Sequence, residues 1–232
     1  MGAWGASGLG SIPSSPTQII LMYTKNFWNK KHLDYASKKW IDKPTIFAKF
    51  AVKYFSRKGK LLDLGSGQGQ DSRYFSKLGY KVLASDFSKV ALRLLKEKST
   101  NDKLDIETKA VDLGKKLPFN DGSFDIVYSH LALHYFNKKT TTSLFSEVAR
   151  VTKMGGILAI LLNTIEDPQI KHLIKIEKDY YLEPGKLFKR YFSAKSLLDF
   201  IDDKFKVLLL DAKGETYKDE IKTLIRFVGE KV

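Results

Sequence analysis

The stretch that decides the fold is Lys60-Leu-Leu-Asp-Leu-Gly-Ser-Gly-Gln-Gly, residues 60–69. Its apolar first half predicts a buried strand, and the glycines at 65, 67 and 69 allow a tight turn that leaves bare main chain for a ligand. No Lys-Ser or Lys-Thr pair follows the glycines, so a phosphate-binding P-loop is not indicated. The spacing also differs from the G-x-G-x-x-G of dinucleotide-binding folds. Because Asp63 precedes the glycines, the pattern favours a ligand that carries positive charge.

Strand and helix patterns alternate five times along the chain around this turn. The expected strands are Lys60–Leu64, Lys81–Ser85, Ile106–Val111, Phe124–Ser129 and Ile157–Leu162. The expected helices between them are Arg73–Leu78, Ser88–Lys98 and Thr140–Val151. This alternation is typical of a Rossmann-like, doubly wound α/β fold with a mostly parallel sheet.

The last third of the chain has a different pattern. An amphipathic helix is expected at Ile170–Tyr180, and Ser193 is expected to cap a helix that ends at Ile201. Two late strands, Lys206–Leu210 and Ile221–Val228, would form an antiparallel hairpin at the sheet edge.

Acidic residues follow two further strands. Asp86 ends the strand after the glycine turn, and Asp112 ends the next one. Ligands of open α/β sheets bind at the carboxyl ends of the strands, where an acid can accept hydrogen bonds from ribose hydroxyls. The three acids and the turn therefore predict one site for a ligand with a ribose, a flat base and a positive centre.

At these residues the sequence resembles the class I S-adenosylmethionine-dependent methyltransferases, over roughly residues 61–163. The resemblance implies a seven-stranded sheet whose last strand is antiparallel, and S-adenosylmethionine as cofactor with S-adenosylhomocysteine as product. The cofactor contacts that it implies are Asp63, Gly65, Ser66, Gly67, Gly69, Asp86, Phe87, Asp112, Leu113 and Ser129. The run from Gly69 to Tyr80 is similar to the small-molecule branch that includes tellurite-resistance and thiopurine methyltransferases.

Candidate substrate contacts lie outside the glycine turn. His134 matches a family position near the transferred methyl group and is the candidate base, although His130 and His134 could instead only cap or pack. The remaining candidates for substrate or lid contacts are Tyr23, Trp28, His130, Tyr135, Arg190 and Tyr191. No metal site is expected, because no third ligand accompanies the two histidines.

Composition limits the organisation of the protein. The 232 residues fit one domain, and the lack of cysteine excludes disulfides and cysteine chemistry. Residues 1–21 contain no charged side chain and are expected to be a leader added for expression, or else a flexible extension. Residues 22–232 would then form the domain, with a helical lid at 22–56, a cofactor-binding core at 60–165 and a substrate-side part at 166–232. Because no apolar run is long enough to span a bilayer, a cytoplasmic protein is expected. A monomer or a homodimer is expected as its oligomeric state.

The net charge of +14 leaves the partner open. The lysines are scattered along the chain, which favours a solvated surface over a nucleic-acid groove. The first hypothesis is methyl transfer to a small-molecule acceptor, in line and driven mainly by proximity. An RNA or protein methyltransferase and a cofactor-binding module without catalysis are the alternatives.

Overall fold

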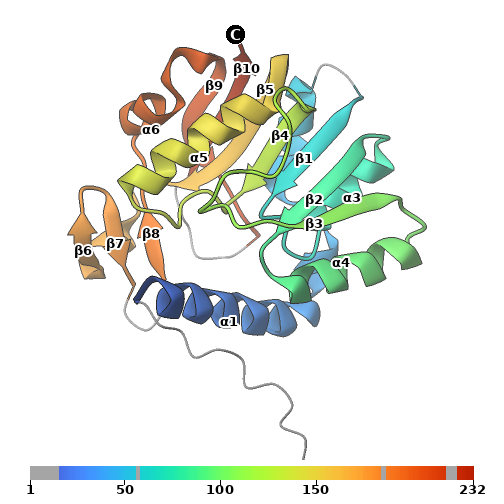
Figure 1. Ribbon diagram of the computed structural model, residues 1–232, viewed down its shortest axis with the longest axis horizontal. Helices are drawn as coiled ribbons and strands as arrows, with labels where there is room; N and C mark the ends of the chain where they lie inside the picture. Colours follow the sequence, from blue (N-terminus) through green and yellow to red (C-terminus); the bar gives the residue numbers. More distant parts are fainter. Residues whose placement is uncertain (1–15, 56–57, 184–186, 218–223) are drawn as a thin grey trace, which may run out of the picture.

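A computed structural model describes residues 16–55, 58–183, 187–217 and 224–232, and its central feature is a seven-stranded sheet (Figure 1). The strand order is β3-β2-β1-β4-β5-β10-β9. The strands are β1 Lys60–Leu64, β2 Lys81–Asp86, β3 Ile106–Ala110, β4 Phe124–His130, β5 Thr152–Asn163, β9 Phe205–Gly214 and β10 Leu224–Lys231. The first five pair in parallel, as the alternation of strands and helices predicts.

The last strand runs against its neighbours. β10 pairs antiparallel with β5 and with β9, which confirms the expected antiparallel last strand. β9 forms the sheet edge, and β10 lies between it and β5.

Helices cover both faces of the sheet, and β5 shows why. Its Leu158, Ile160 and Leu162 join one buried cluster with α5, while Ile157 and Leu161 join a second cluster on the other face. A strand buried on both faces is continuously apolar. The helices are α1 Pro16–Ala36, α2 Ile46–Ala51, α3 Gln70–Lys77, α4 Lys89–Asn101, α5 Lys138–Val151 and α6 Ala194–Ile201. Short 3-10 helices lie at Lys39–Asp42, Val52–Tyr54, Pro168–His172 and Asp202–Lys204.

Helix α1 runs across one end of the sheet, from the small sheet at the left of Figure 1 to α4. It begins at Pro16, so residues 16–21 continue into the same helix as Met22. The expected leader at 1–21 therefore overlaps a helix in its last six positions, and residues 1–15 lie outside the described residues.

The prediction of a helix at Ile170–Tyr180 is wrong. A short 3-10 helix is followed by β6 Ile174–Glu177 and β7 Tyr180–Leu182, which pair with β8 Phe188–Arg190 in a separate antiparallel sheet. Exposed Ile174 and Ile176 alternate with polar residues, a period of two that fits a strand better than a helix. The described residues of 166–232 thus form the small sheet and α6 ahead of β9 and β10, where helices and an edge hairpin were expected.

The helix after it is as expected. Ser193 caps α6 reciprocally with Ser196, and the helix ends at Ile201. None of the helices within the described ranges combines the length and apolar character needed to cross a bilayer.

Candidate functional site

A cleft of about 1080 Å³ lies at the carboxyl ends of the parallel strands. Residues from the ends of β1, β2, β4 and β5 line it, together with α1, the loop after β4 and the β7–β8 hairpin. This is the edge of a doubly wound sheet where ligands bind.

The glycine turn forms the floor of the cleft. Gly65, Gly67 and Gly69 have φ values of 70°, 54° and 71°, a region that residues with a Cβ rarely adopt. A Cβ on Gly65 would lie 2.2 Å from Cβ of Ala132. The turn therefore needs glycine for its conformation and for the close approach of the loop after β4.

Asp86 joins the turn to the second strand. Its Oδ2 accepts a hydrogen bond of 3.0 Å from the backbone N–H of Gly67, and its Oδ1 accepts one of 2.8 Å from that of Ser88. Burial raises the pKa of Asp86, while nearby His32 and the backbone N–H donors act in the opposite direction. The carboxylate thus fixes the turn and faces the cleft at the same time.

Asp63 lies beneath the turn and is 2% exposed. Burial, reinforced by neighbouring Asp71, raises its pKa to about 8, although Ser72 Oγ donates a hydrogen bond of 2.5 Å to it. Asp71 accepts hydrogen bonds from the Tyr128 hydroxyl at 2.7 Å and the Thr45 hydroxyl at 2.8 Å. Neither Asp63 nor Asp71 has a basic partner among the contacts described here, so a cationic ligand in the cleft would meet buried carboxyl groups that no lysine or arginine compensates.

The third predicted acid also reaches the cleft. Asp112 lines it beside Leu113, and Phe87 lies there too. Asp112 Oδ1 accepts a hydrogen bond of 2.9 Å from the N–H of Gly114, and Lys115 Nζ lies 3.9 Å from its Oδ2. The structure therefore brings the three strand-end acids, the glycine turn and both flanking apolar residues together.

Sequence reasoning missed His32. This histidine of α1 is 7% exposed and lines the cleft, and a Cβ on Gly67 would lie 3.0 Å from its Cε1. Burial lowers its pKa, opposed by the charge of Asp86. Its Nδ1 is buried and has no hydrogen-bond partner within the described part of the chain. No motif marks it, because α1 lies far from the glycine turn in the sequence.

Further buried polar atoms around the turn have no hydrogen bond to a described residue. Ser66 Oγ, Gln68 Oε1 and Gln70 Oε1 are buried without a hydrogen bond to any described residue, and all three residues line the cleft. Unsatisfied buried polar atoms are costly, so such a group at one place indicates a polar ligand. The donor and acceptor set fits a nucleoside with an amino-acid tail.

The loop after β4 supplies the other predicted contacts. His130, His134 and Tyr135 all line the cleft, and His134 is 2% exposed. The His134 ring lies 4.4 Å from that of Tyr135, centroid to centroid, and the Trp28 ring lies 5.5 Å from Tyr135 at 75°. Trp28 of α1 therefore reaches the site as expected for a lid residue.

Five predicted residues are not among those that line the cleft, and one of them, Gly69, contributes to the turn through its left-handed backbone conformation. Ser129 is buried and donates a hydrogen bond of 2.8 Å to the carbonyl oxygen of Leu64, which ties β4 to β1. Tyr23 is 48% exposed on α1 and directly precedes Thr24, which lines the cleft. Arg190 and Tyr191 are each 3% exposed, and neither is among the residues that line the cleft.

Arg190 has a different role from the one expected. Its Nε donates a hydrogen bond of 3.1 Å to the carbonyl oxygen of Phe136, and its guanidinium also pairs with Glu177. The backbone N–H of Arg190 donates one of 2.7 Å to the carbonyl oxygen of His134. Arg190 thus holds the loop after β4 against β8 and does not face an acceptor.

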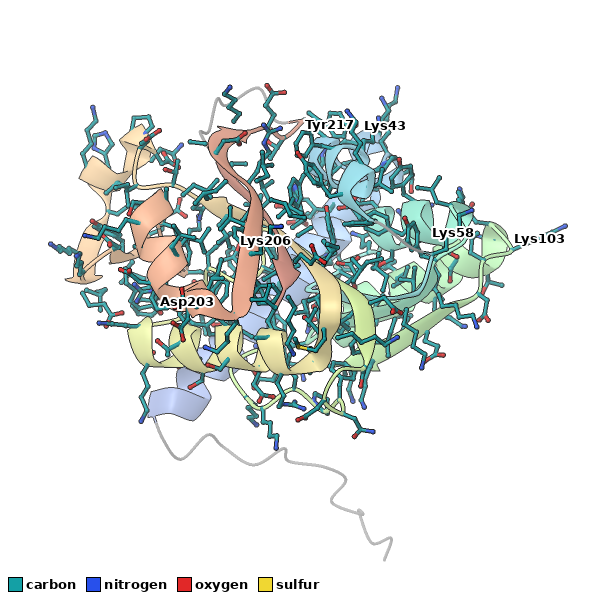
Figure 2. All side chains as sticks on the ribbon, turned by 90° about the horizontal axis from the view of Figure 1, so that it is seen from above. Lys43, Lys58, Lys103, Asp203, Lys206 and Tyr217 are labelled. Atoms are coloured by element: carbon teal, nitrogen blue, oxygen red, sulfur yellow. The ribbon has the colours of Figure 1, made fainter. Side chains whose placement is uncertain are left out.

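The charge of the cleft differs from that of the whole chain. Its described lining contains three lysines and five carboxyl groups, a formal charge of −2 with histidine neutral. Lysines such as Lys43, Lys58 and Lys103 are exposed and project outward (Figure 2). Across the described ranges, no three His, Cys, Asp or Glu side chains are grouped to hold a metal ion.

Comparison with known proteins shows what this arrangement is similar to. Residues 62–160 match the sequence model of a family described as "Methyltransferase domain". An uncharacterised methyltransferase of Synechocystis is 36% identical over 102 residues, 44% of this chain and 46% of that protein. TehB of Haemophilus influenzae, named a probable S-adenosyl-L-methionine-dependent methyltransferase, is 30% identical over 97 residues, 42% of this chain and 33% of that protein. The chain thus aligns with less than half the length of these curated relatives.

Solved structures share the fold over a longer range. One is a 1,6-didemethyltoxoflavin-N1-methyltransferase of Burkholderia thailandensis, with its substrate and S-adenosylhomocysteine bound. Its TM-score is 0.72 at 13% identity, and the match covers 97% of this chain and 93% of that one.

Proposed function

We propose that the chain, whose residues 62–160 match the methyltransferase-domain family, is a class I S-adenosylmethionine-dependent methyltransferase and that it methylates a small-molecule acceptor. The observation that carries this proposal is the meeting of Asp63, Asp86 and Asp112 with the glycine turn in one cleft. Three carboxyl groups beside bare main chain suit a ribose, a base and a charged sulfur.

Each acid has a place in the proposed binding mode. Asp86, held by Gly67 and Ser88, accepts the ribose hydroxyls. Asp112 and Leu113 meet the adenine edge and face, with Phe87 on the same side. Asp63 and the glycine turn hold the amino-acid tail, whose ammonium group compensates the buried carboxylate.

The cofactor supplies an electrophilic methyl carbon on a sulfonium. The chain's part is to hold an acceptor in line with that carbon and to exclude water, since proximity and orientation supply much of the rate. The acceptor forms the new bond as the carbon–sulfur bond breaks, with the electron pair left on sulfur. We propose that His134, buried and facing the cleft, takes the proton from acceptors that carry one.

A small acceptor is favoured over a nucleic acid by the charge of the cleft. Its described lining has a formal charge of −2, which would repel a phosphate backbone, while the exposed lysines explain the charge of the whole chain without a groove. Relatives point the same way, since a demethylmenaquinone methyltransferase of Thermobifida fusca is 35% identical over 100 residues. A malonyl-[acyl-carrier protein] O-methyltransferase of Buchnera aphidicola is 37% identical over 101 residues, and its named acceptor is an acyl group on a carrier protein, which is also not a nucleic acid.

The test is turnover with a panel of small acceptors. The purified chain is incubated with S-adenosylmethionine and separate pools of phenols, heteroaromatic amines, carboxylates and thiols, and S-adenosylhomocysteine is quantified by mass spectrometry. We expect the wild type to release S-adenosylhomocysteine with one of the acceptor pools, and we expect Asp86→Ala to release none. Release only with added RNA or protein would favour the alternative, and cofactor binding without any release would favour a binding module.

A further inference from the structure

The acceptor half of the cleft has walls rich in aromatic rings. Three separate elements supply them: α1, the loop after β4 and the β7–β8 hairpin. The ring-bearing residues in this part of the lining are Trp28, Tyr35, His134, Tyr135 and Tyr180. The Tyr180 hydroxyl donates a hydrogen bond of 3.4 Å to the carbonyl oxygen of Tyr135, so the hairpin and the loop are joined at this point.

The lysines of the described lining are all engaged. Lys189 Nζ lies 2.7 Å from Oε2 of Glu183, and Lys115 pairs with Asp112 on the cofactor side. Lys31 Nζ lies 5.8 Å from the centroid of the Phe27 ring. The described lining contains no arginine, and Arg190 is buried behind the loop. Lys189 and Lys115 are therefore each paired with a carboxylate, and the described lining carries two more carboxyl groups than lysines, which disfavours an anionic acceptor.

From this juxtaposition of rings and compensated charges we propose that the acceptor is a neutral, planar aromatic molecule, bound against Tyr135 and Trp28. The inference rests on the proposed function, because it assigns the substrate class of the same site. Aromatic rings pair edge-to-face or offset at centroid separations of about 4.5–7 Å, and such pairs are stronger than their buried area alone explains. The reacting atom is a hydroxyl oxygen or a ring nitrogen, since either carries a lone pair without a net charge on the molecule.

Three probes of one size separate this class from its alternatives. They are 2-naphthol, which is planar and neutral, 2-naphthoic acid, which is planar and anionic at pH 7, and decahydro-2-naphthol, which is neutral but saturated. Each is titrated by calorimetry into the full chain saturated with S-adenosylhomocysteine. We expect 2-naphthol to bind at least about tenfold more tightly than either of the others. Equal or tighter binding of the acid or of the saturated alcohol overturns the proposal, as does no binding of 2-naphthol at millimolar concentration.

Variants of Tyr135 test where the probe binds. Tyr135→Phe keeps the ring and should retain the affinity for 2-naphthol, whereas Tyr135→Leu should weaken it about fivefold or more. Tyr23→Leu, a change on the same helix as Trp28 but outside the cleft, is the matched control and should bind like the wild type. If Tyr135→Phe loses as much affinity for 2-naphthol as Tyr135→Leu, or if Tyr135→Leu loses none, the placement of the probe against Tyr135 is contradicted.

The cofactor titration separates the two proposals. If S-adenosylhomocysteine binds but 2-naphthol does not exceed the other probes, the acceptor class alone is wrong. If S-adenosylhomocysteine itself does not bind, the proposed function fails.

Discussion

Gln68 Nε2 donates a hydrogen bond of 2.7 Å to the backbone carbonyl oxygen of His32, which ties the glycine turn to α1. A second link lies nearby, where the Ser88 hydroxyl donates one of 2.6 Å to Oδ1 of Asn29. Helix α1 is therefore fastened over the cofactor side of the cleft, and the His32 ring lies against Gly67. A ligand that enters this side has to contact α1 or displace it.

Replacement of His32 should weaken cofactor binding. Its buried Nδ1 has no partner within the described residues, and it lies beside Asp86, so a bound ribose is expected to satisfy it. We expect His32→Ala to raise the Kd of S-adenosylhomocysteine about tenfold, which corresponds to one hydrogen bond to a buried group. His32→Gln should recover part of the affinity. His172→Ala changes an exposed histidine and should have no effect in the same calorimetric titration.

Replacement of Asp86 should weaken cofactor binding more than replacement of an exposed acidic residue does. Asp86→Ala removes the acceptor of the Gly67 and Ser88 N–H groups and the proposed partner of the ribose. The expected loss is about 1.5–3 kcal/mol of binding free energy, from about tenfold to more than a hundredfold in Kd. Asp105→Asn, an exposed carboxyl outside the cleft, is the control. Equal affinities of Asp86→Ala and the wild type for S-adenosylhomocysteine would remove Asp86 from the site.

Asp63 should make stability depend on pH. The folded state holds the proton of this carboxyl up to about pH 8, while the unfolded chain releases it near the ordinary value of 3.8. Between these values the folded state binds more protons, so this group lowers the free energy of unfolding as pH rises, by at most about 1.4 kcal/mol per pH unit. Asp63→Asn keeps an oxygen that can accept the hydrogen bond of Ser72 but cannot ionise.

Comparing the wild type with Asp63→Asn isolates the contribution of the Asp63 carboxyl group to the pH dependence of stability. In urea unfolding from pH 5 to pH 8, we expect the stability advantage of Asp63→Asn over the wild type to grow with pH. Its affinity for S-adenosylmethionine should fall, because the charge opposite the ammonium group is lost. A stability difference that is constant with pH would show that Asp63 does not titrate in this range.

Replacement of Arg190 should change kcat and the KM for the acceptor more than it changes cofactor affinity. Arg190→Met removes the hydrogen bond to the carbonyl oxygen of Phe136 and the ion pair with Glu177, so the loop that carries His134 loses these contacts with β8. We expect kcat to fall and KM for the acceptor to rise, while the Kd of S-adenosylhomocysteine changes less than about twofold. A loss of cofactor affinity as large as the loss of kcat would place Arg190 in cofactor binding instead. Arg190→Lys should recover only part of kcat, because a lysine cannot reproduce the planar set of donors.

The cofactor half of the site could be predicted because its geometry is local to the strands. Gly67, Asp86 and Asp112 each follow a parallel strand, and parallel strands bring their carboxyl ends to one edge. Ser129 lies near the end of β4, but its side chain donates a hydrogen bond to the carbonyl oxygen of Leu64, and sequence position alone does not give that direction.

The contacts that come from outside these strand ends could not be predicted in the same way. His32 reaches the turn only because α1 packs across the sheet end, a long-range contact that no motif encodes. Arg190 was a candidate for substrate or lid contacts, yet its partners Phe136 and Glu177 come from other parts of the chain. The β6–β7 hairpin was missed because strands of three or four residues give too short a pattern to distinguish from a helix.

The measurement that tests the central claim most directly is calorimetric titration of S-adenosylhomocysteine into the full chain. The account predicts saturable binding of one molecule per chain, weakened at least about tenfold in Asp86→Ala and unchanged in Asp105→Asn. No binding at millimolar concentration, or the same affinity in all three proteins, would contradict it.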